Sequence, residues 1–456
     1  MATTKSVPTR GTTIARAIVL GLAAFFVALF VFLLGRRSFH GGGSLTGFLV
    51  ASAVLALLFA SAIFWPPLAR LKLLLITGSV VFGLYVVEIT LTAIGRPGAK
   101  PSAEVAAAPS AADHRSKLEV IGELRAAGVD AWPTVHPQVF LGSGGLPIHG
   151  EAAIPLGGIS RVRTVYCIES DRWAIFDGDE HGFNNPLGLH RPGEVDVALI
   201  GDSFAEGACV QPGEDLASRL RAAPATTRVV SLGNGGDGPL TELATLIEYA
   251  APLRPRVVVW LYYEDNDLLD LELERHEPAL VRYLDGGFSA HLVDHQDEID
   301  RALRAFVTRE REATSDNEGQ HFVGKVVSAI KLSTLRDRLG GISYPEPSPL
   351  FARTLQRANE TVSGWGGKLY LVYLPAWSRY QKQPANADRA FRGYGRVLEI
   401  AAEQSLPVID FQESLAAAED PLRNFPGRRA GHYSPEGYAR LAALIHARLQ
   451  ADKRLP

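Results

Sequence analysis

Long apolar runs dominate the first 95 residues of the chain and give way to shorter ones afterwards. The three longest lie at 17–35, 45–65 and 73–94, and each is close to the roughly 20 residues that a helix needs to cross the hydrocarbon core of a membrane. Because two further runs follow the first, we interpret the first as a retained span rather than a cleaved signal peptide. The sequence therefore predicts a membrane anchor of three transmembrane helices over residues 1–95.

The charges of this segment indicate how the anchor is oriented. Residues 1–100 carry nine Lys or Arg and a single acid, Glu88, whereas acids outnumber bases in the remainder. With three spans, five of the nine bases would lie on the same side of the membrane as the N-terminus and four on the opposite side; the five are Lys5, Arg10, Arg16, Arg70 and Lys72. Cytoplasmic ends of membrane helices carry the excess of positive charge, so we expect a multi-pass protein of the inner (cytoplasmic) membrane with its later residues in the periplasm or outside the cell.

Glu88 lies within the third apolar run, where a carboxylate is costly unless it faces other helices, water or a partner. One interpretation makes it a substrate or proton site. The interpretation that we favour is a neutral or near-interface carboxyl packed among the three helices.

Beyond a linker at 96–115 that is rich in Ala, Pro and Ser, short β-rich runs alternate with helical patterns over residues 116–456. The strand candidates are 195–200, 228–232, 257–263, 368–374 and 407–411, and the helical candidates include 240–251, 389–404 and 435–450. This alternation is typical of a parallel sheet that helices cover on both faces. The predicted fold class is α/β, a three-layer α/β/α arrangement around a central parallel sheet of about five strands.

Polar and glycine-rich segments follow these strands, at the sheet edge where ligands bind in folds of this kind. They are Gly201-Asp202-Ser203-Phe204, Gly233-Asn234-Gly235-Gly236-Asp237-Gly238, Glu264-Asp265-Asn266-Asp267 and, some twenty residues after the last strand, Gly431-His432-Tyr433-Ser434-Pro435. Together they offer a hydroxyl, backbone amides, a side-chain amide and an imidazole. These are the groups that acyl transfer at an ester requires.

The four segments resemble the sequence blocks of the SGNH (GDSL) hydrolase superfamily over roughly residues 190–450. The resemblance implies that Ser203 is the nucleophile and His432 the general base. It also implies that the backbone amides of Ser203 and Gly236 and the side chain of Asn266 stabilise the oxyanion. The stretch 176–186 is similar to a lead-in found in bacterial members, often beside surface-polysaccharide pathways.

Two positions depart from the pattern of that family. Most members have an Asp three residues before the histidine, where this chain has Arg429. We expect Asp410, or else Glu413 or Asp420, to take the place of that acid in space, unless the site operates as a Ser–His dyad. Glu264 stands where relatives often have Gly, and it is expected to narrow the pocket or to add an acid beside the oxyanion site.

Other functional classes find little support. An acidic body argues against nucleic-acid binding, and no lysine follows the glycines of 233–238 as a phosphate loop would need. The histidines show no metal-ligand spacing, and His291 and His295 fit a solvated helix start, so no metal or cofactor is expected. The two cysteines, Cys167 and Cys209, are either bonded to each other or buried as separate thiols.

A helical insertion at about 270–365, with helices expected at 296–312 and 321–339, would form a cap over the strand ends. The predicted function is that of a membrane-anchored SGNH-type esterase acting on an acylated cell-surface polysaccharide or glycolipid. Two alternatives stay open: an O-acyltransferase of the same fold, and a non-catalytic component that binds polysaccharide or organises an export complex. The expected partners are the acylated glycan or glycolipid, membrane lipid and export or biosynthesis proteins.

Overall fold

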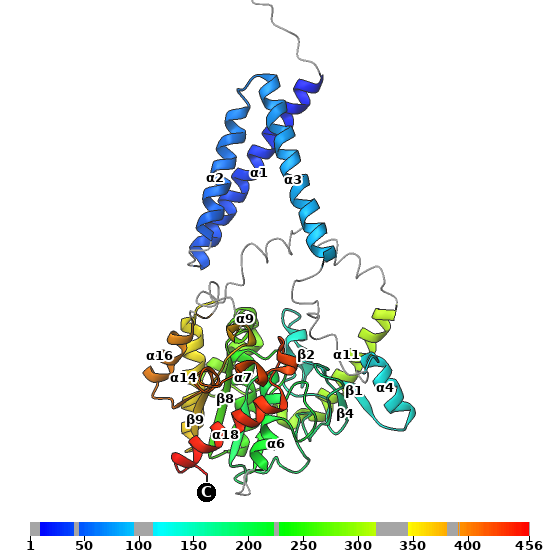
Figure 1. Cartoon of the computed structure of the whole chain (residues 1–456), viewed down its shortest axis with the longest axis vertical. Coiled ribbons are helices and arrows are strands. Elements are labelled where there is room, and N and C mark those ends of the chain that lie inside the picture. The colour runs from blue at the N-terminus through cyan, green and yellow to red at the C-terminus, as the bar shows by residue number, and fades with distance from the viewer. Residues whose placement is uncertain are drawn as a thin grey trace, which may run out of the picture. The chain divides into compact units, whose positions relative to one another are not determined.

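A computed structural model describes residues 10–40, 45–94, 113–222, 228–315, 345–380, 391 and 393–455 (Figure 1). The chain divides into two compact units. One contains the N-terminal helices, and the other contains the α/β part. The helix predicted at 321–339 lies outside the described residues.

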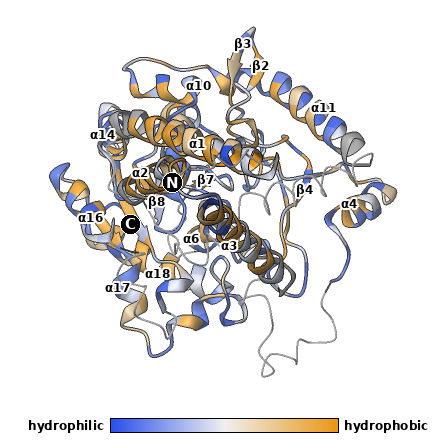
Figure 2. Cartoon of the chain, turned by 90° about the horizontal axis from the view of Figure 1, so that it is seen from above, coloured by the Kyte–Doolittle hydropathy of each residue, from blue (hydrophilic) through white to orange (hydrophobic). Residues whose placement is uncertain are grey.

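The N-terminal unit consists of three helices, α1 (Arg10–His40), α2 (Leu45–Ala62) and α3 (Pro67–Ile94). Two of them are long and apolar enough to cross a membrane, over Gly11–Leu34 and Pro67–Glu88, whereas the apolar part of α2 is shorter, Leu49–Ala62. Of the three predicted membrane spans, those in α1 and α3 are therefore supported and the one in α2 is not. Figure 2 shows the predominantly hydrophobic colouring of these helices.

Some apolar side chains of the three helices are buried between the helices, whereas others are exposed. Val19 and Ala23 of α1 pack with Phe59 of α2 in a small buried cluster. Large apolar side chains such as Phe82, which is 71% exposed, point away from it. A core helix of a water-soluble domain would cover such side chains, so this pattern favours a lipid surrounding. Glu88 is buried.

The second unit is built on a parallel five-stranded sheet with the order β10-β9-β8-β6-β7. Its strands are β6 (Val197–Ile200), β7 (Val229–Ser231), β8 (Val257–Tyr263), β9 (Lys368–Leu374) and β10 (Val408–Asp410). All five predicted strands are present, and every pairing between neighbours is parallel. The predicted α/β class and the number of strands are confirmed.

The sheet separates two hydrophobic cores because successive side chains of a strand point to opposite faces. In β8, Val258, Trp260 and Tyr262 enter one core, and Val257, Val259 and Leu261 enter the other. The first core receives side chains from α7 (Pro239–Thr245), the π-helical turn η3 (Leu246–Ala250), α8 (Ala251–Leu253), α14 (Pro349–Gly364) and α16 (Gly393–Glu403). The second receives them from α5 (Ser203–Glu206), α6 (Leu216–Arg221), α17 (Phe411–Ala416) and α18 (Pro435–Ala451). These are the three predicted layers.

A smaller layer precedes the main sheet, and the sequence pattern did not reveal it. It contains α4 (Lys117–Ala126), the short turn η2 (Pro137–Phe140), a three-stranded sheet of β1 (Ala131–Pro133), β4 (Arg163–Val165) and β5 (Ile175–Asp177), and a hairpin of β2 (Leu146–Ile148) and β3 (Glu151–Ala153). Its strands have only three residues each, too few to show an alternation of apolar and polar positions. We refer to residues 113–190 as the N-terminal layer.

The stretch predicted as an insertion contains α9 (Asp267–Glu274), α10 (Pro278–Val281), the turns η4 (Arg282–Leu284) and η5 (Leu292–His295), and α11 (Gln296–Ser315). α14, which ends this stretch, buries Phe351, Leu355 and Ala358 in the first core. It is the crossover helix that precedes β9. The segment additional to the α/β core therefore ends before α14.

Candidate active site

Ser203 begins α5 directly after the end of β6, because the turn Gly201-Asp202 reverses the chain there. Oδ1 of Asp202 accepts a hydrogen bond from the backbone N–H of Phe204 (2.9 Å) and so caps α5. A capping carboxylate of this kind satisfies a backbone donor that the first turn of a helix leaves open. The nucleophile candidate is thus held in a fixed strand–turn–helix junction.

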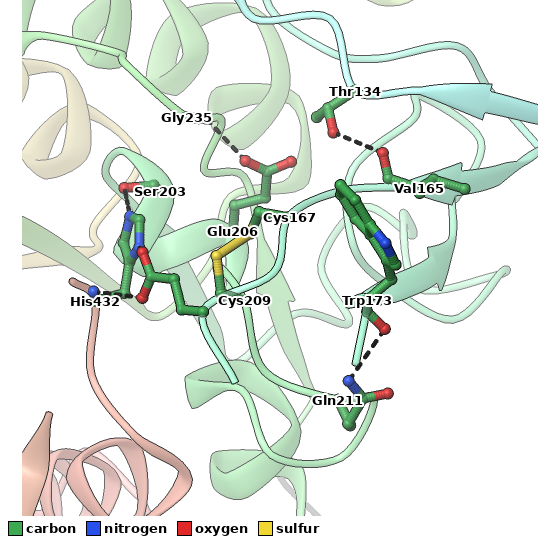
Figure 3. Close-up of a disulfide and its surroundings, with 11 residues drawn as sticks. Thr134, Val165, Cys167, Trp173, Ser203, Glu206, Cys209, Gln211, Gly235 and His432 are labelled. Carbon is green, nitrogen blue, oxygen red and sulfur yellow. Dashed lines mark hydrogen bonds and ion pairs between the residues drawn. A yellow bond between two sulfur atoms is a disulfide. The ribbon is translucent and has the colours of Figure 1, made fainter. Parts of the chain in front are cut away.

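His432 lies in the segment that leads into α18. The hydroxyl of Ser434 caps that helix by accepting from the N–H of Gly437 (3.2 Å), and it donates to the carbonyl of Arg423 (3.0 Å). Nε2 of His432 lies 2.8 Å from Oγ of Ser203, although the two residues are 229 positions apart in the chain. The structure therefore brings the hydroxyl and the imidazole within hydrogen-bonding distance (Figure 3).

The acid next to the imidazole is Glu169, which lies in the turn between β4 and β5. Its Oε1 is 2.7 Å from Nδ1 of His432, and its Oε2 accepts the backbone N–H of the same residue at 2.8 Å. A Cβ atom at position 431 would lie 2.6 Å from Oε2, so glycine is required there for the carboxylate to approach. Sequence reasoning missed Glu169 because it precedes every block of the family pattern.

The expectation that Asp410 takes the place of the missing acid is wrong. Oδ1 of Asp410 caps α17 by accepting from the N–H groups of Gln412 (2.8 Å) and Glu413 (3.3 Å), and Oδ2 accepts from the hydroxyl of Tyr394. The carboxylate is used locally at the end of β10. The other two candidates are also placed elsewhere: Glu413 is exposed on α17, and Asp420 pairs with Arg428.

The pKa shifts of Glu169 and His432 support their assignment as the acid and the base. Burial on its own would lower the pKa of His432, but the hydrogen bond and the charge of Glu169 outweigh it, so the pKa is raised. Burial likewise opposes ionisation of Glu169, yet its contacts with His432 lower the pKa of the carboxyl below its usual value. With Glu169 ionised, the neutral imidazole carries its proton on Nδ1, which leaves Nε2 free to accept from the Ser203 hydroxyl.

Asn266 lies close to the hydroxyl, at the start of α9. Oδ2 of Asp202 lies 3.4 Å from Oγ of Ser203 and accepts a long hydrogen bond from Nδ2 of Asn266 (3.3 Å). The second N–H of the amide is donated to Oδ2 of Asp270 at 2.9 Å. An oxyanion on this side would therefore have to replace the long bond between Asn266 and Asp202.

Gly236 lies under Gln138 of the N-terminal layer, since a Cβ there would be 2.9 Å from the Oε1 atom of that side chain. Its φ of +78° is in the left-handed region, which favours glycine. Nε2 of Gln138 donates to Oδ1 of Asp270 at 2.9 Å. Gln138 thus contacts Gly236 directly and reaches Asn266 through Asp270, and it connects two of the three candidate oxyanion donors.

Glu264 does not add an acid beside the oxyanion site, contrary to one expectation. Its carboxylate is buried against the end of β9, where it accepts from the N–H of Ala376 (2.7 Å) and from Nε of Arg379 (3.0 Å). The hydroxyl of Tyr373 donates to it as well. Glu264 therefore stabilises the segment after β9 as part of a buried ion pair.

Several other carboxyl groups are buried beneath the Ser203 region. Burial raises the pKa of Glu206, of Asp270 and of Glu274 to about 7 in each case. Glu274 accepts from the N–H groups of Gly238 (2.7 Å) and Leu240 (2.9 Å). Near neutral pH this region therefore holds protonated carboxyls together with ionised ones.

The lead-in stretch 176–186 has a structural role. Oδ1 of Asp179, which is fully buried, accepts from the N–H groups of His181 (2.8 Å) and Phe183 (3.0 Å). Asn185 exchanges hydrogen bonds with the backbone of Ser231 in β7, both at 2.8 Å. The stretch therefore fastens the N-terminal layer, and with it Glu169, to the edge of the main sheet.

Two groups of side chains in the described part of the chain have donor atoms close enough to share a metal ion: Asp179 with Glu180 and His190, and Glu169 with Cys209 and His432. Asp179 is occupied by the bonds just described and by Nε2 of His190 at 2.7 Å. Cys209 is bonded to Cys167. Neither arrangement supports a metal centre in this form of the protein.

No protein-family model matches the chain, and no curated protein matches it. Among solved structures, a lipase/acylhydrolase from Enterococcus faecalis is 18% identical over 57% of this chain and 97% of its own, with a TM-score of 0.33. An acetyl xylan esterase is 12% identical over 56% and 100%, with a TM-score of 0.32. A GDSL-like lipase from Bacteroides thetaiotaomicron is 14% identical over 57% and 89%, with a TM-score of 0.31. TM-scores of this size carry no argument of their own, so the assignment of the fold rests on the strand order and registers of this chain.

Proposed function

We propose that the chain is a membrane-anchored serine ester hydrolase of the SGNH type. The observation that carries the proposal is the continuous hydrogen-bonded series from Ser203 through His432 to Glu169, with 2.8 Å and 2.7 Å between the bonded atoms. A hydroxyl, an imidazole and a carboxylate in this order form the arrangement that activates a serine for attack on an acyl carbon.

The chemistry follows from the positions of the three side chains. Oγ of Ser203 attacks the ester carbonyl while Nε2 of His432 takes the hydroxyl proton, and the same proton is then given to the leaving alcohol. Glu169 holds the ring in the required tautomer and stabilises the imidazolium that forms. Water, activated by the same imidazole, then hydrolyses the acyl-enzyme.

The acyl group is proposed to belong to a cell-surface polysaccharide or glycolipid. Two helices able to cross a membrane support attachment to a membrane. A position of the α/β unit outside the cytoplasm additionally requires that α2 also crosses, because only an odd number of spans places it opposite a cytoplasmic N-terminus. The bond between Cys167 and Cys209 supports the same position, because disulfides persist in oxidising compartments.

Transfer of the acyl group to a sugar hydroxyl uses the same acyl-enzyme and is the second candidate. The non-catalytic alternative loses its main support, since Glu169 supplies the acid whose absence from the family position suggested a decayed triad. The family position holds Arg429, which is exposed.

The test uses the full chain in detergent micelles with a fluorophosphonate probe and with nitrophenyl esters of different acyl lengths. We expect labelling at Ser203, turnover of at least one ester, and loss of both in Ser203→Ala and His432→Ala. If the intact chain neither labels nor turns over any ester, the hydrolase proposal is wrong. Release of the acyl group into water, compared with its appearance on added oligosaccharide, separates hydrolysis from transfer.

A further inference from the structure

The only two cysteines of the chain form a disulfide beside the candidate triad. Cys167 follows the end of β4 and precedes Glu169 by two residues, and Cys209 follows Ser203 by six. The bond therefore joins the turn that carries the acid to the segment that carries the nucleophile, across 42 positions of sequence. Figure 3 shows it next to Ser203 and His432.

The bond packs directly against the acid and the base. Sγ of Cys209, a carboxylate oxygen of Glu169 and a ring nitrogen of His432 all lie within 4.8 Å of one another. Cys209 is 5% exposed, and its φ of +59° is in a region that residues other than glycine rarely adopt. A residue held in such a conformation indicates that its surroundings fix it closely.

The turn that carries Glu169 has modest support of its own. It extends from strands of three residues and is closed at its base by the bonds from Tyr166 N–H to the Ala174 carbonyl (2.9 Å) and from Ala174 N–H to the Cys167 carbonyl (2.8 Å). Besides the disulfide, one hydrogen bond joins the turn to the segment 209–211: Nε2 of Gln211 donates to the Trp173 carbonyl at 3.2 Å. On its other side the turn is held by the bond from the Asp113 N–H to the Asp171 carbonyl (2.7 Å). The covalent bond is the strongest of these restraints, and Cys167 lies two residues from Glu169.

We propose that the Cys167–Cys209 disulfide positions Glu169 on His432, so that full esterase activity requires the oxidised form of the protein. The inference rests on the proposed function. In the oxidised form the turn keeps its carboxylate within hydrogen-bonding distance of Nδ1. When a small dithiol reduces the bond, it gives up two electrons and two protons and becomes a cyclic disulfide, and the protein disulfide takes them up and becomes two thiols. Glu169 then loses its fixed position.

The first experiment compares the wild-type full chain in detergent with Cys167→Ser/Cys209→Ser. Replacing the triad acid of a serine protease costs about 10⁴-fold in kcat, so partial misplacement is expected to lower kcat by about tenfold or more with little change in KM. Dithiothreitol should lower the wild-type kcat similarly and reversibly, and should leave the double variant unchanged. A wild-type rate that is insensitive to complete reduction would overturn the proposal.

The pH profile of kcat/KM shows whether the effect passes through the imidazole. The charged groups that act on His432 are Glu169, Asp202 and Glu206, and Glu169 acts most strongly. Release of Glu169 therefore moves the acid limb of the profile to lower pH as kcat falls. An unmoved limb with a reduced rate would instead indicate a general loss of structure.

A double-mutant cycle makes the test specific to Glu169. In a Glu169→Gln background, removal of the disulfide should have almost no further effect on kcat, since the contact that it supports is already lost. If the fold-losses in kcat from Glu169→Gln and from removal of the disulfide multiply in the combined variant, the proposal is contradicted.

A folding control accompanies these measurements. Near-ultraviolet circular dichroism identifies a temperature at which the cysteine variant is folded, and reduction of the wild-type chain repeats the comparison without any substitution. If Ser203→Ala retains full turnover, the proposed function itself fails, which is a separate result.

Discussion

Glu169 and His432 are 263 positions apart in the chain and share two hydrogen bonds, one to the imidazole and one to the backbone N–H of the histidine. The acid comes from the N-terminal layer, and the base comes from the segment before the last helix of the main unit. The N-terminal layer therefore completes a site whose other parts lie on the parallel sheet. The two-point contact fixes the position of the loop at residue 432 as well as the orientation of the ring.

Glu169→Gln should lower kcat by about 10²- to 10⁴-fold, because the variant can no longer stabilise the imidazolium. Glu169 raises the pKa of His432, so its removal should also move the acid limb of the pH–rate profile to lower pH. Steady-state kinetics between pH 4.5 and 9 measure both effects. Glu123→Gln, at an exposed site on α4, is the control and should match the wild type. An unchanged profile in Glu169→Gln would rule out the assigned acid.

Gly431→Ala should damage the site without removing any functional group. The new Cβ would lie 2.6 Å from Oε2 of Glu169, closer than unbonded atoms approach, so either the carboxylate or the His432 loop must shift. We expect kcat to fall by at least about tenfold, since small displacements of catalytic groups are costly. In the Glu169→Gln background, by contrast, Gly431→Ala should lower kcat much less. Gly395→Ala on α16, where nothing lies within 4 Å of the added atom, is the matched control.

The bonds among Gln138, Asp270 and Asn266 predict a third effect. Asp270→Asn leaves Gln138 and Asn266 competing for one acceptor oxygen, so the amide of Asn266 loses its fixed orientation. Because removal of an oxyanion donor costs about 10²- to 10³-fold, misorientation should lower kcat by about tenfold, with KM little changed. Glu272→Gln, at an exposed position on the same helix, should have no effect. A rise in KM alone in Asp270→Asn would place the residue in substrate binding instead.

The sequence was most informative where long periodic patterns exist. Runs such as 257–263 and 369–374 are apolar throughout, because the strands are buried on both faces, and β8 and β9 have the predicted bounds. Ser203 and His432 could be predicted as a pair because each belongs to a short pattern at a strand end or a helix start. These signals are local in the chain, so a sequence alone suffices to find them.

Glu169 could not be found in this way. It lies in a turn between two strands of three residues, and no local pattern distinguishes it from other surface acids of the chain. Asp410 was favoured for its place at the end of a strand, but a carboxylate there caps the following helix just as well. The one available clue was the pair Cys167 and Cys209. If they are bonded, the residues beside Cys167 must lie near Ser203, but that pairing was an open alternative in the sequence.

The buried carboxyls predict that the α/β unit becomes less stable as the pH rises toward neutrality. The pKa values of Glu206, Asp270 and Glu274 are raised to about 7 by burial, whereas an unfolded chain has values near 4. The folded state therefore binds more protons between these limits, so the free energy of unfolding falls from about pH 4.5 to pH 7 and levels off above. All three groups act in the same direction, since each binds its proton more tightly in the folded state than in the unfolded chain.

Urea unfolding of the full chain in detergent, followed by tryptophan fluorescence, tests this at pH 5 and pH 7.5. We expect a lower midpoint at pH 7.5. Glu206→Gln is neutral at every pH, so it should reduce the difference between the two midpoints, because one of the three groups no longer ionises. Glu436→Gln, at an exposed site on α18, should leave the difference unchanged. Equal midpoints in the wild type would contradict the raised pKa values of these three carboxyls.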